Sequence, residues 1–460
     1  MDRKRQLASQ ASALAAGASA NSSPLRQVDP LYILMSLSGA TLLMNKAPFL
    51  GLGATLMTLA LGILAWCHRR RILAAYAMPL ILLTCMYVYL LMSYLASNQP
   101  ISAFGDYQFL KEDGNFFFAY ALFFAYASPY ISHRKLFTVY HNLLFYVFSA
   151  LALLGAIEMA TGITGVLSDY YMGEFYFSAL NKAHNATGSV YAAASVATLS
   201  AWLFDSKSPK KRRRYLFFLS CCLLGLMMTR SRGSMLAFGI AAVFLYRTRY
   251  GLRFLASWRF IVLVVLLTAV ILATGAQRRL STLASYQTDY NTMDRLVKWE
   301  KAWHLFKLSP IVGIGFGRFN DLDFREAFGD CVQGYPGIAA FCIDATPVYD
   351  SGHAHNSYLQ FLAETGLAGL GLLLTFWYSL YMRLRRAFAD SNDDMVTLAS
   401  VQGMAEIVLL LSLSLTENYL SATTVMLFMS ASIGISLGIV SRSTRKSQTL
   451  FIAGNRQASV

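Results

Sequence analysis

A polar loop gives way to a long apolar segment at Gly352–Tyr381, which reads GHAHNSYLQFLAETGLAGLGLLLTFWYSLY. From Ser357 onward the run is long and apolar enough to cross a hydrocarbon core, which takes about 20 residues of helix. The polar residues before it, His353, His355 and Asn356, therefore lie where a membrane helix meets water. Polar and charged groups are costly so close to hydrocarbon and usually have a partner, so this junction is the first candidate for a functional site.

The composition extends this interpretation to the whole chain. Hydrophobic residues make up 56% of the 460 residues and charged residues only 14%, a balance too apolar for an ordinary soluble protein. We therefore predict an all-α polytopic membrane protein with about 12 transmembrane helices. Their expected positions are near 31–44, 49–67, 72–95, 115–131, 136–158, 187–204, 215–229, 233–247, 258–275, 355–381, 399–416 and 420–440.

The basic residues predict the orientation in the membrane. A net charge of +15 would suggest nucleic-acid binding in a soluble protein. Here 26 of the 39 Lys and Arg residues lie in the two tails or in alternate short loops, such as 69–71, 207–214, 247–259 and 383–386. The positive-inside rule places these loops and both termini in the cytoplasm, so we expect no nucleic-acid partner.

The chain accordingly divides into five regions. A cytoplasmic tail covers 1–30, and the first nine transmembrane helices cover 31–275. A large external loop covers 276–354, the last three transmembrane helices cover 355–440, and a second cytoplasmic tail covers 441–460.

The large external loop contains structure of its own. Met293–Leu308 places Leu296, Trp299, Trp303 and Phe306 on one helical stripe, which predicts a helix on the membrane surface. The glycines of Gly313–Gly317 follow without a strand-to-helix context, so we do not expect a nucleotide site there. Cys331 and Cys342 face an oxidising compartment in this topology, and we expect a disulfide between them.

Arginines on the external side indicate an anion site. Arg230 and Arg232 begin a span, and Arg295 begins the surface helix. No matching cluster of acids accompanies Arg230 and Arg232, and planar guanidinium groups bind phosphate oxygens bidentately. We therefore predict a pyrophosphate ligand. The alternative is that these arginines extend to lipid headgroups or cap helix ends.

His355 is the candidate base at the junction. An imidazole titrates near neutral pH and can take a proton from a sugar hydroxyl. The alternative is a hydrogen-bonded interfacial histidine without a catalytic role. The His353-Ala354-His355 spacing also permits a metal site, but no third ligand with motif spacing stands out, so we expect none.

Three blocks of sequence carry a resemblance to a known family. They are Thr229–Ser234 (TRSRGS), Arg295–Trp299 (RLVKW) followed by Ser309–Gly315 (SPIVGIG), and His355-Asn356 followed after nine residues by Gly366–Gly369 (GLAG). In these blocks the chain resembles the O-antigen ligase and polymerase superfamily of bacterial inner-membrane glycosyltransferases. The resemblance covers roughly residues 30–440.

The resemblance implies a GT-C-like enzyme of the bacterial inner membrane, with the large loop between the ninth and tenth helices in the periplasm and no metal or other cofactor. The implied partners are an undecaprenyl-pyrophosphate-linked glycan donor, a lipid A-core acceptor and membrane lipids. By position, His355 is the implied base, and Arg232 and Arg295 hold the pyrophosphate. We assign substrate binding to Arg230, His353, Asn356, His184 and Arg318.

The expected activity is that of an inverting O-antigen ligase, which transfers polysaccharide from undecaprenyl pyrophosphate to a lipid A-core sugar hydroxyl. An O-antigen polymerase would use a lipid-linked glycan as acceptor instead. A protein O-oligosaccharyltransferase is a third possibility. A transporter of lipid-linked glycans, with the arginines lining a passage, is the alternative from another class.

Overall fold

The computed structural model describes residues 62–63, 65–96, 120, 123–127, 135–162, 167–171, 174–179, 183–205, 208–251, 253, 257–258, 261, 265, 290–319, 353–420, 425–426 and 428–441. The helices are α4 (Arg69–Ala96), α6 (Lys135–Thr161), α7 (His184–Phe204), α8 (Pro209–Met228), α9 (Arg232–Tyr250), α12 (Tyr290–Leu308), α15 (Ser357–Asp390) and α16 (Asp394–Leu413). Phe428–Ser441 forms a further apolar helix. Strands β1 (Ser168–Tyr171) and β2 (Glu174–Phe177) form an antiparallel hairpin, which the sequence analysis did not predict.

The described part of the chain is largely helical and belongs to an integral membrane protein. Four of its helices are long and apolar enough to cross a membrane, namely Arg69–Ser93, Phe137–Thr161, Ser357–Asp390 and Asp394–Leu413. They coincide with four expected spans, and α7, α8, α9 and Phe428–Ser441 are helices where four more were expected. The expected spans near 31–44, 49–67, 115–131 and 258–275 lie wholly or largely outside the described residues, as do Cys331 and Cys342. The total of 12 and the orientation of the termini stay predictions.

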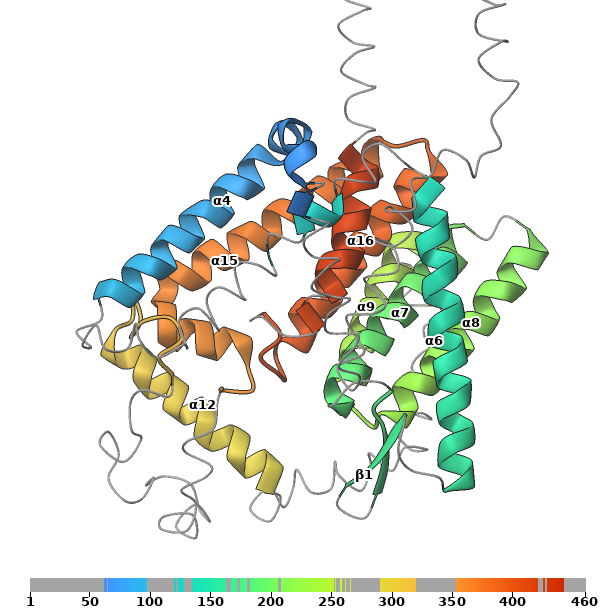
Figure 1. Cartoon of the computed structure of the whole chain (residues 1–460), viewed down its shortest axis with the longest axis horizontal. Coiled ribbons are helices and arrows are strands. Elements are labelled where there is room, and N and C mark those ends of the chain that lie inside the picture. Colours follow the sequence, from blue (N-terminus) through green and yellow to red (C-terminus); the bar gives the residue numbers. More distant parts are fainter. Residues whose placement is uncertain are drawn as a thin grey trace, which may run out of the picture.

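Helices α15 and α16 lie between α4 and α12 on one side and α7 and α9 on the other (Figure 1). Helix α15 contacts α4, α12 and α16, and α16 in turn contacts α7 and α9. Helix α7 is buried from Thr187 to Ala201, and its many Gly, Ala and Ser residues let neighbouring backbones approach closely. At Gly188 a Cβ atom would meet the side chains of Thr229, Ser231 and Ser234, so the start of α7 lies directly on the start of α9.

Helix α15 is interrupted at Gly366, which has φ +61°. The segment after α12 pairs with the backbone groups around this break. The N–H of Leu367 donates to the Pro310 carbonyl at 2.9 Å, and the N–H of Gly315 donates to the Glu364 carbonyl at 2.9 Å. Tyr89 of α4 donates its hydroxyl to the Thr365 carbonyl at 2.8 Å. A broken helix is tolerated at membrane depth only when its backbone groups are satisfied by protein in this way.

The amphipathic helix predicted over Met293–Leu308 is present as α12. The side that it buries differs from the tryptophan stripe. Ala302 and Leu305 are buried with Ala354 and Ala363, whereas Trp303 is 46% exposed. The face between α12 and α15 is therefore made of small and aliphatic residues, and Trp303 remains exposed, as suits an aromatic ring at a membrane interface.

A buried polar cluster lies within α16. The Glu406 Oε1 atom accepts hydrogen bonds from Ser432 Oγ at 2.6 Å and from Gln402 Nε2 at 2.9 Å. Ser432 belongs to the helix Phe428–Ser441, and all three side chains are buried. These hydrogen bonds therefore fix α16 against that helix in the interior of the bundle.

We expect Gly366→Ala to lower the melting temperature of the purified protein. A positive φ costs a non-glycine residue about 1–3 kcal/mol, and an added Cβ would overlap the Ile311 carbonyl. Gly371→Ala in the same helix is the matched control, because a Cβ there meets nothing within 4 Å. Thermal unfolding in detergent measures both. Equal melting temperatures of the two variants would contradict the role given to Gly366.

Candidate functional site

The carboxylate of Glu417 joins three separate segments at one end of the bundle. Glu417 lies in the turn that follows α16, and its side chain is 14% exposed. Its Oε2 atom is 2.8 Å from His355 Nδ1. Its Oε1 atom accepts a hydrogen bond from Arg295 Nη2 of α12 at 3.0 Å. The structure therefore brings together His355 and Arg295, which the sequence analysis selected, through a residue to which it gave no role.

The backbone before α15 fixes the position of His355. Asn356 is the N-cap of α15, and its Oδ1 atom accepts hydrogen bonds from the N–H groups of Tyr358 and Leu359 at 3.0 and 3.1 Å. His355, directly before the cap, has φ +50°, an uncommon conformation for a non-glycine residue. Ser357 then donates its hydroxyl to the Glu417 carbonyl at 3.1 Å. The start of α15 and the turn that carries Glu417 are thus fastened to each other independently of the His355 contact.

Gln360 supports the same junction from the buried side. Its Oε1 atom accepts hydrogen bonds from Ala354 N and Asn418 Nδ2, both at 3.0 Å. Its Nε2 atom donates to Glu364 Oε1 at 3.1 Å, and the same oxygen accepts from Phe319 N at 3.2 Å. This network holds the residues on either side of His355 and Glu417 in place.

Helix α9 begins beside Glu417 and carries Arg232 as its first residue. A Cβ at Gly233 would overlap the Thr416 hydroxyl, so the backbone next to Arg232 touches the residue next to Glu417. The backbone of Arg232 therefore lies next to the turn that carries Glu417, and its place in the site stays a prediction. Within the described residues, the Glu417 side chain forms hydrogen bonds with His355, Arg295 and Asn185.

The remaining predicted residues lie around this centre. The guanidinium of Arg230 lies 5.6 Å over the ring of Tyr176 in β2, and that ring is 4.6 Å from the ring of His184. Asn185, next to His184, donates to Glu417 Oε1 at 3.5 Å. His353 lies with its ring 4.3 Å from the His355 ring. The hairpin thus serves the site by placing Tyr176 beneath Arg230.

Two predicted substrate-binding residues have structural contacts in the site. The Asn356 side-chain oxygen is engaged as the cap of α15. Arg318 is buried in the glycine-rich turn after α12, where its N–H donates to the Gly315 carbonyl at 3.3 Å. Neither residue hydrogen-bonds Glu417.

The charges around Glu417 keep it ionised. Burial alone would raise the pKa of Glu417, but the hydrogen bond with His355 and the charges of His355, Arg295 and His353 together hold its pKa below the usual value. An ionised carboxylate only accepts hydrogen bonds, so the proton of the contact belongs to His355 Nδ1. The Nε2 atom of a neutral His355 is then left with a lone pair that can take a proton.

His353, His355 and Glu417 also form a possible metal-ligand set, with one donor atom from each within 4.8 Å of the others. A divalent cation would have to replace the His355 proton between Nδ1 and Oε2. It would also lie beside the guanidinium of Arg295, which already neutralises Glu417. The donor set therefore fits a cation poorly while Arg295 is in place.

Glu417 and Asn418 directly follow the expected span 399–416, but the sequence analysis did not connect them with His355. The sequence feature that could have identified Glu417 is a carboxylate at the end of a long apolar span, because a charged side chain at such a position is costly without a partner. The pairing itself joins residues 62 positions apart and was visible only in the fold.

Comparison with known proteins connects this site with a family. Residues 215–374 match the family model described as O-antigen ligase, a segment that includes Arg230, Arg232, Arg295 and His355 but ends before Glu417. The chain is also 27% identical over 112 residues to the exopolysaccharide production protein ExoQ of Rhizobium meliloti strain 1021. That alignment covers 24% of this chain and 23% of ExoQ, so the chain spans less than a quarter of this relative. Over residues 215–374 the chain is therefore similar to the O-antigen ligase family.

Proposed function

We propose that this protein is an O-antigen ligase, which transfers a polysaccharide from undecaprenyl pyrophosphate to a sugar hydroxyl of lipid A-core on the periplasmic side of the inner membrane. The observation that carries the proposal is the Arg295–Glu417–His355 contact, with distances of 3.0 and 2.8 Å. It supplies a basic nitrogen next to a group of arginines at the end of a membrane bundle, which is what transfer from a lipid pyrophosphate requires.

In the proposed reaction, His355 Nε2 takes the proton of the acceptor hydroxyl as its oxygen attacks the anomeric carbon of the donor. The bond between that carbon and the pyrophosphate oxygen breaks, and the electron pair leaves with the pyrophosphate. Arg232 and Arg295 stabilise the charge that develops there, an interaction stronger in the transition state than in the ground state. A single displacement of this kind inverts the anomeric carbon.

Glu417 is the positioning residue for both groups in this proposal. Its hydrogen bond to Nδ1 leaves Nε2 as the basic atom and stabilises the imidazolium that forms on proton transfer. Its other oxygen holds the end of the Arg295 side chain. A carboxylate shared in this way sets the distance between the base and the phosphate-binding cation.

A polymerase is the second candidate, because the similar Rhizobium protein is named for exopolysaccharide production. A polymerase would use the same donor and the same base. The two activities differ in the acceptor, which would be a second lipid-linked glycan rather than lipid A-core. The choice between them is therefore made by an acceptor assay.

We expect His355→Ala to lower the transfer rate by about 10²–10⁴-fold, the usual contribution of general base catalysis. The assay combines purified protein, lipid-linked glycan donor and either lipid A-core or more donor as acceptor, with and without EDTA. His68→Ala is the matched control, because His68 precedes α4. At 1.5 Å per residue it lies roughly 30 Å along that helix from Tyr89, the residue of α4 that contacts α15 at Thr365.

Each outcome of this assay has a definite meaning. Glycosylated lipid A-core, unaffected by EDTA and lost in His355→Ala, supports a metal-independent ligase. Longer chains on the carrier lipid indicate a polymerase. Full activity of His355→Ala would show that His355 is not the base. A loss of activity with EDTA would indicate a metal ion bound by His353, His355 and Glu417.

The Glu417 carboxylate also predicts a pH dependence of stability. Its pKa in the folded protein lies below that of an unfolded glutamate, about 4.3. It therefore stabilises the fold fully above that pH, and this contribution is lost as the pH falls through the lower, folded-state pKa.

We accordingly expect Glu417→Gln to melt below the wild type at neutral pH, with a difference that shrinks as the medium is acidified below pH ~4. Melting temperatures over a pH series measure it. Asp390→Asn, at the exposed end of α15, is the control and should stay close to the wild type throughout. A difference for Glu417→Gln that is constant with pH would contradict the ionised carboxylate.

A further inference from the structure

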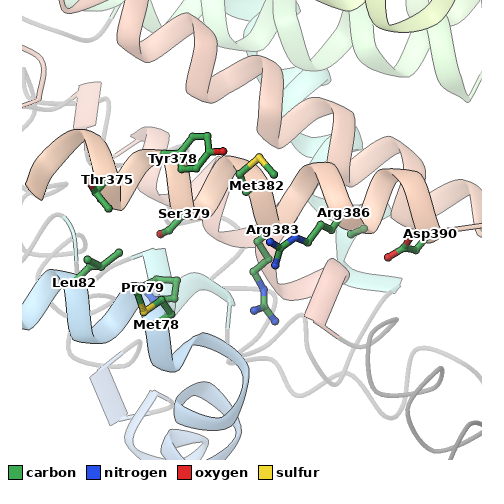
Figure 2. A pocket seen from close by; sticks show the side chains of 11 residues that line it. Met78, Pro79, Leu82, Thr375, Tyr378, Ser379, Met382, Arg383, Arg386 and Asp390 are labelled. Carbon is green, nitrogen blue, oxygen red and sulfur yellow. The ribbon is translucent and has the colours of Figure 1, made fainter. Parts of the chain in front are cut away.

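A groove separates α4 and α15 at the end of α15 away from His355 (Figure 2). Its cavity has a volume of about 500 Å³. One wall is made by Met78, Pro79 and Leu82 of α4, and the other runs along α15 from Thr375 to Asp390. The groove is separate from the candidate site, because α15 rises roughly 25 Å between Gly366 and Arg383 at 1.5 Å per residue.

The sequence of α4 explains why the two helices part here. Pro79 lies inside the helix and has no N–H to donate, and its ring crowds the carbonyl of the preceding turn. Tyr76, three residues earlier, leaves helical geometry with φ −127° and ψ 26°. Further along, Tyr89 ties α4 to the carbonyl of Thr365 on α15. The irregular turn at Tyr76–Pro79 thus leaves the groove open between α4 and α15, and the Tyr89 hydrogen bond holds the same two helices together further along.

One end of the groove is cationic. Arg383 and Arg386 both line it, and Figure 2 shows the Arg383 side chain extending from α15 into the space between the helices. Within the described residues, neither arginine forms an ion pair, and the Arg383 Nε atom is buried without a hydrogen-bond partner. The Arg383 guanidinium lies 4.6 Å over the ring of Tyr76. Asp390, one turn beyond Arg386, is the acid of the lining, so the arginines outnumber it.

The other part of the groove is apolar and open at the side. Met78 is 60% exposed and Tyr378 is 63% exposed, although both lie on helices long and apolar enough to cross a membrane. Exposed apolar side chains on such helices face hydrocarbon. A ligand that fills the whole groove must therefore combine an anionic group with a long apolar chain.

We propose that this groove binds an anionic phospholipid. Its phosphodiester lies between Arg383 and Arg386, where guanidinium groups pair with phosphate oxygens. One acyl chain lies along Met78, Leu82 and Tyr378. The lipid comes from the leaflet opposite to the Glu417 site. The positive-inside rule, applied to the basic residues of 69–71 and 383–386, places this leaflet on the cytoplasmic side.

A lipid bound in this groove also affects the packing of α4 against α15. A lipid seated between α4 and α15 bridges the two helices where Pro79 keeps them apart. The same helices meet again at Tyr89, which contacts the loop after α12 as well as α15. Binding of the lipid therefore stabilises the α4–α15 pair on which that loop rests.

Native mass spectrometry of the purified full chain tests the proposal. The protein is titrated in detergent with phosphatidylglycerol, with phosphatidylethanolamine or with inorganic phosphate. We expect one tightly bound phosphatidylglycerol, weaker phosphatidylethanolamine and no retained phosphate. Arg386→Gln should weaken phosphatidylglycerol binding about fivefold, equivalent to the roughly 1 kcal/mol that one basic residue contributes near an anionic membrane surface. Met78→Trp should reduce binding by filling the apolar part without changing the charge.

Arg385→Gln is the matched control, because Arg385 is exposed on the same turn of α15 but does not line the groove. The melting temperature of each variant shows that the fold is intact. Equal binding of both phospholipids would overturn the proposal in favour of a neutral occupant such as a polyprenyl chain. If Arg385→Gln and Arg386→Gln weakened phosphatidylglycerol binding equally, the binding would be a general attraction of anionic lipids to basic residues, and the specific site would be overturned. Neither result bears on transfer at His355.

Discussion

The shared carboxylate of Glu417 is the contact on which the geometry of the candidate site depends. Its partners come from α12 and from the start of α15, so one side chain relates three segments that are distant in sequence. Arg295 keeps 37% of its side chain exposed, so water screens this pair and its contribution lies below the ~3–5 kcal/mol of a fully buried one. The importance of the contact is therefore geometric: it fixes the His355 imidazole and the Arg295 guanidinium relative to each other.

The break in α15 serves the same geometry. Backbone groups cannot remain unpaired at membrane depth, and those around Gly366 are paired by the segment that follows α12. Helix α12, which carries Arg295, is thereby attached at a second point to α15, the helix that His355 precedes. The site is thus held by backbone hydrogen bonds on one side and by Ser357, Gln360 and the Asn356 cap on the other.

Hydropathy was sufficient to predict most of the described helices, because a membrane span is a local property of composition. Helix α12 was also predictable from its period, although the side that it buries contains Ala302 and Leu305 rather than Trp303. The motif resemblance selected His355, Arg232 and Arg295, and the fold brings the first and third onto one carboxylate. The role of Glu417, the hairpin under Arg230 and the break at Gly366 depend on contacts between distant segments, which no local pattern records.

The buried cluster around Glu406 has a consequence for how the protein is made. Polar and ionisable side chains at the centre of a helix are costly to insert into the membrane, and α16 carries both Glu406 and Gln402. The hydrogen-bond partner that compensates, Ser432, lies on the helix Phe428–Ser441, which is synthesised afterwards. Helix α16 is therefore most stable in the bilayer once its successor is present. The two segments gain by leaving the translocon as a pair, which makes the helix Phe428–Ser441 part of the biogenesis of the turn that carries Glu417.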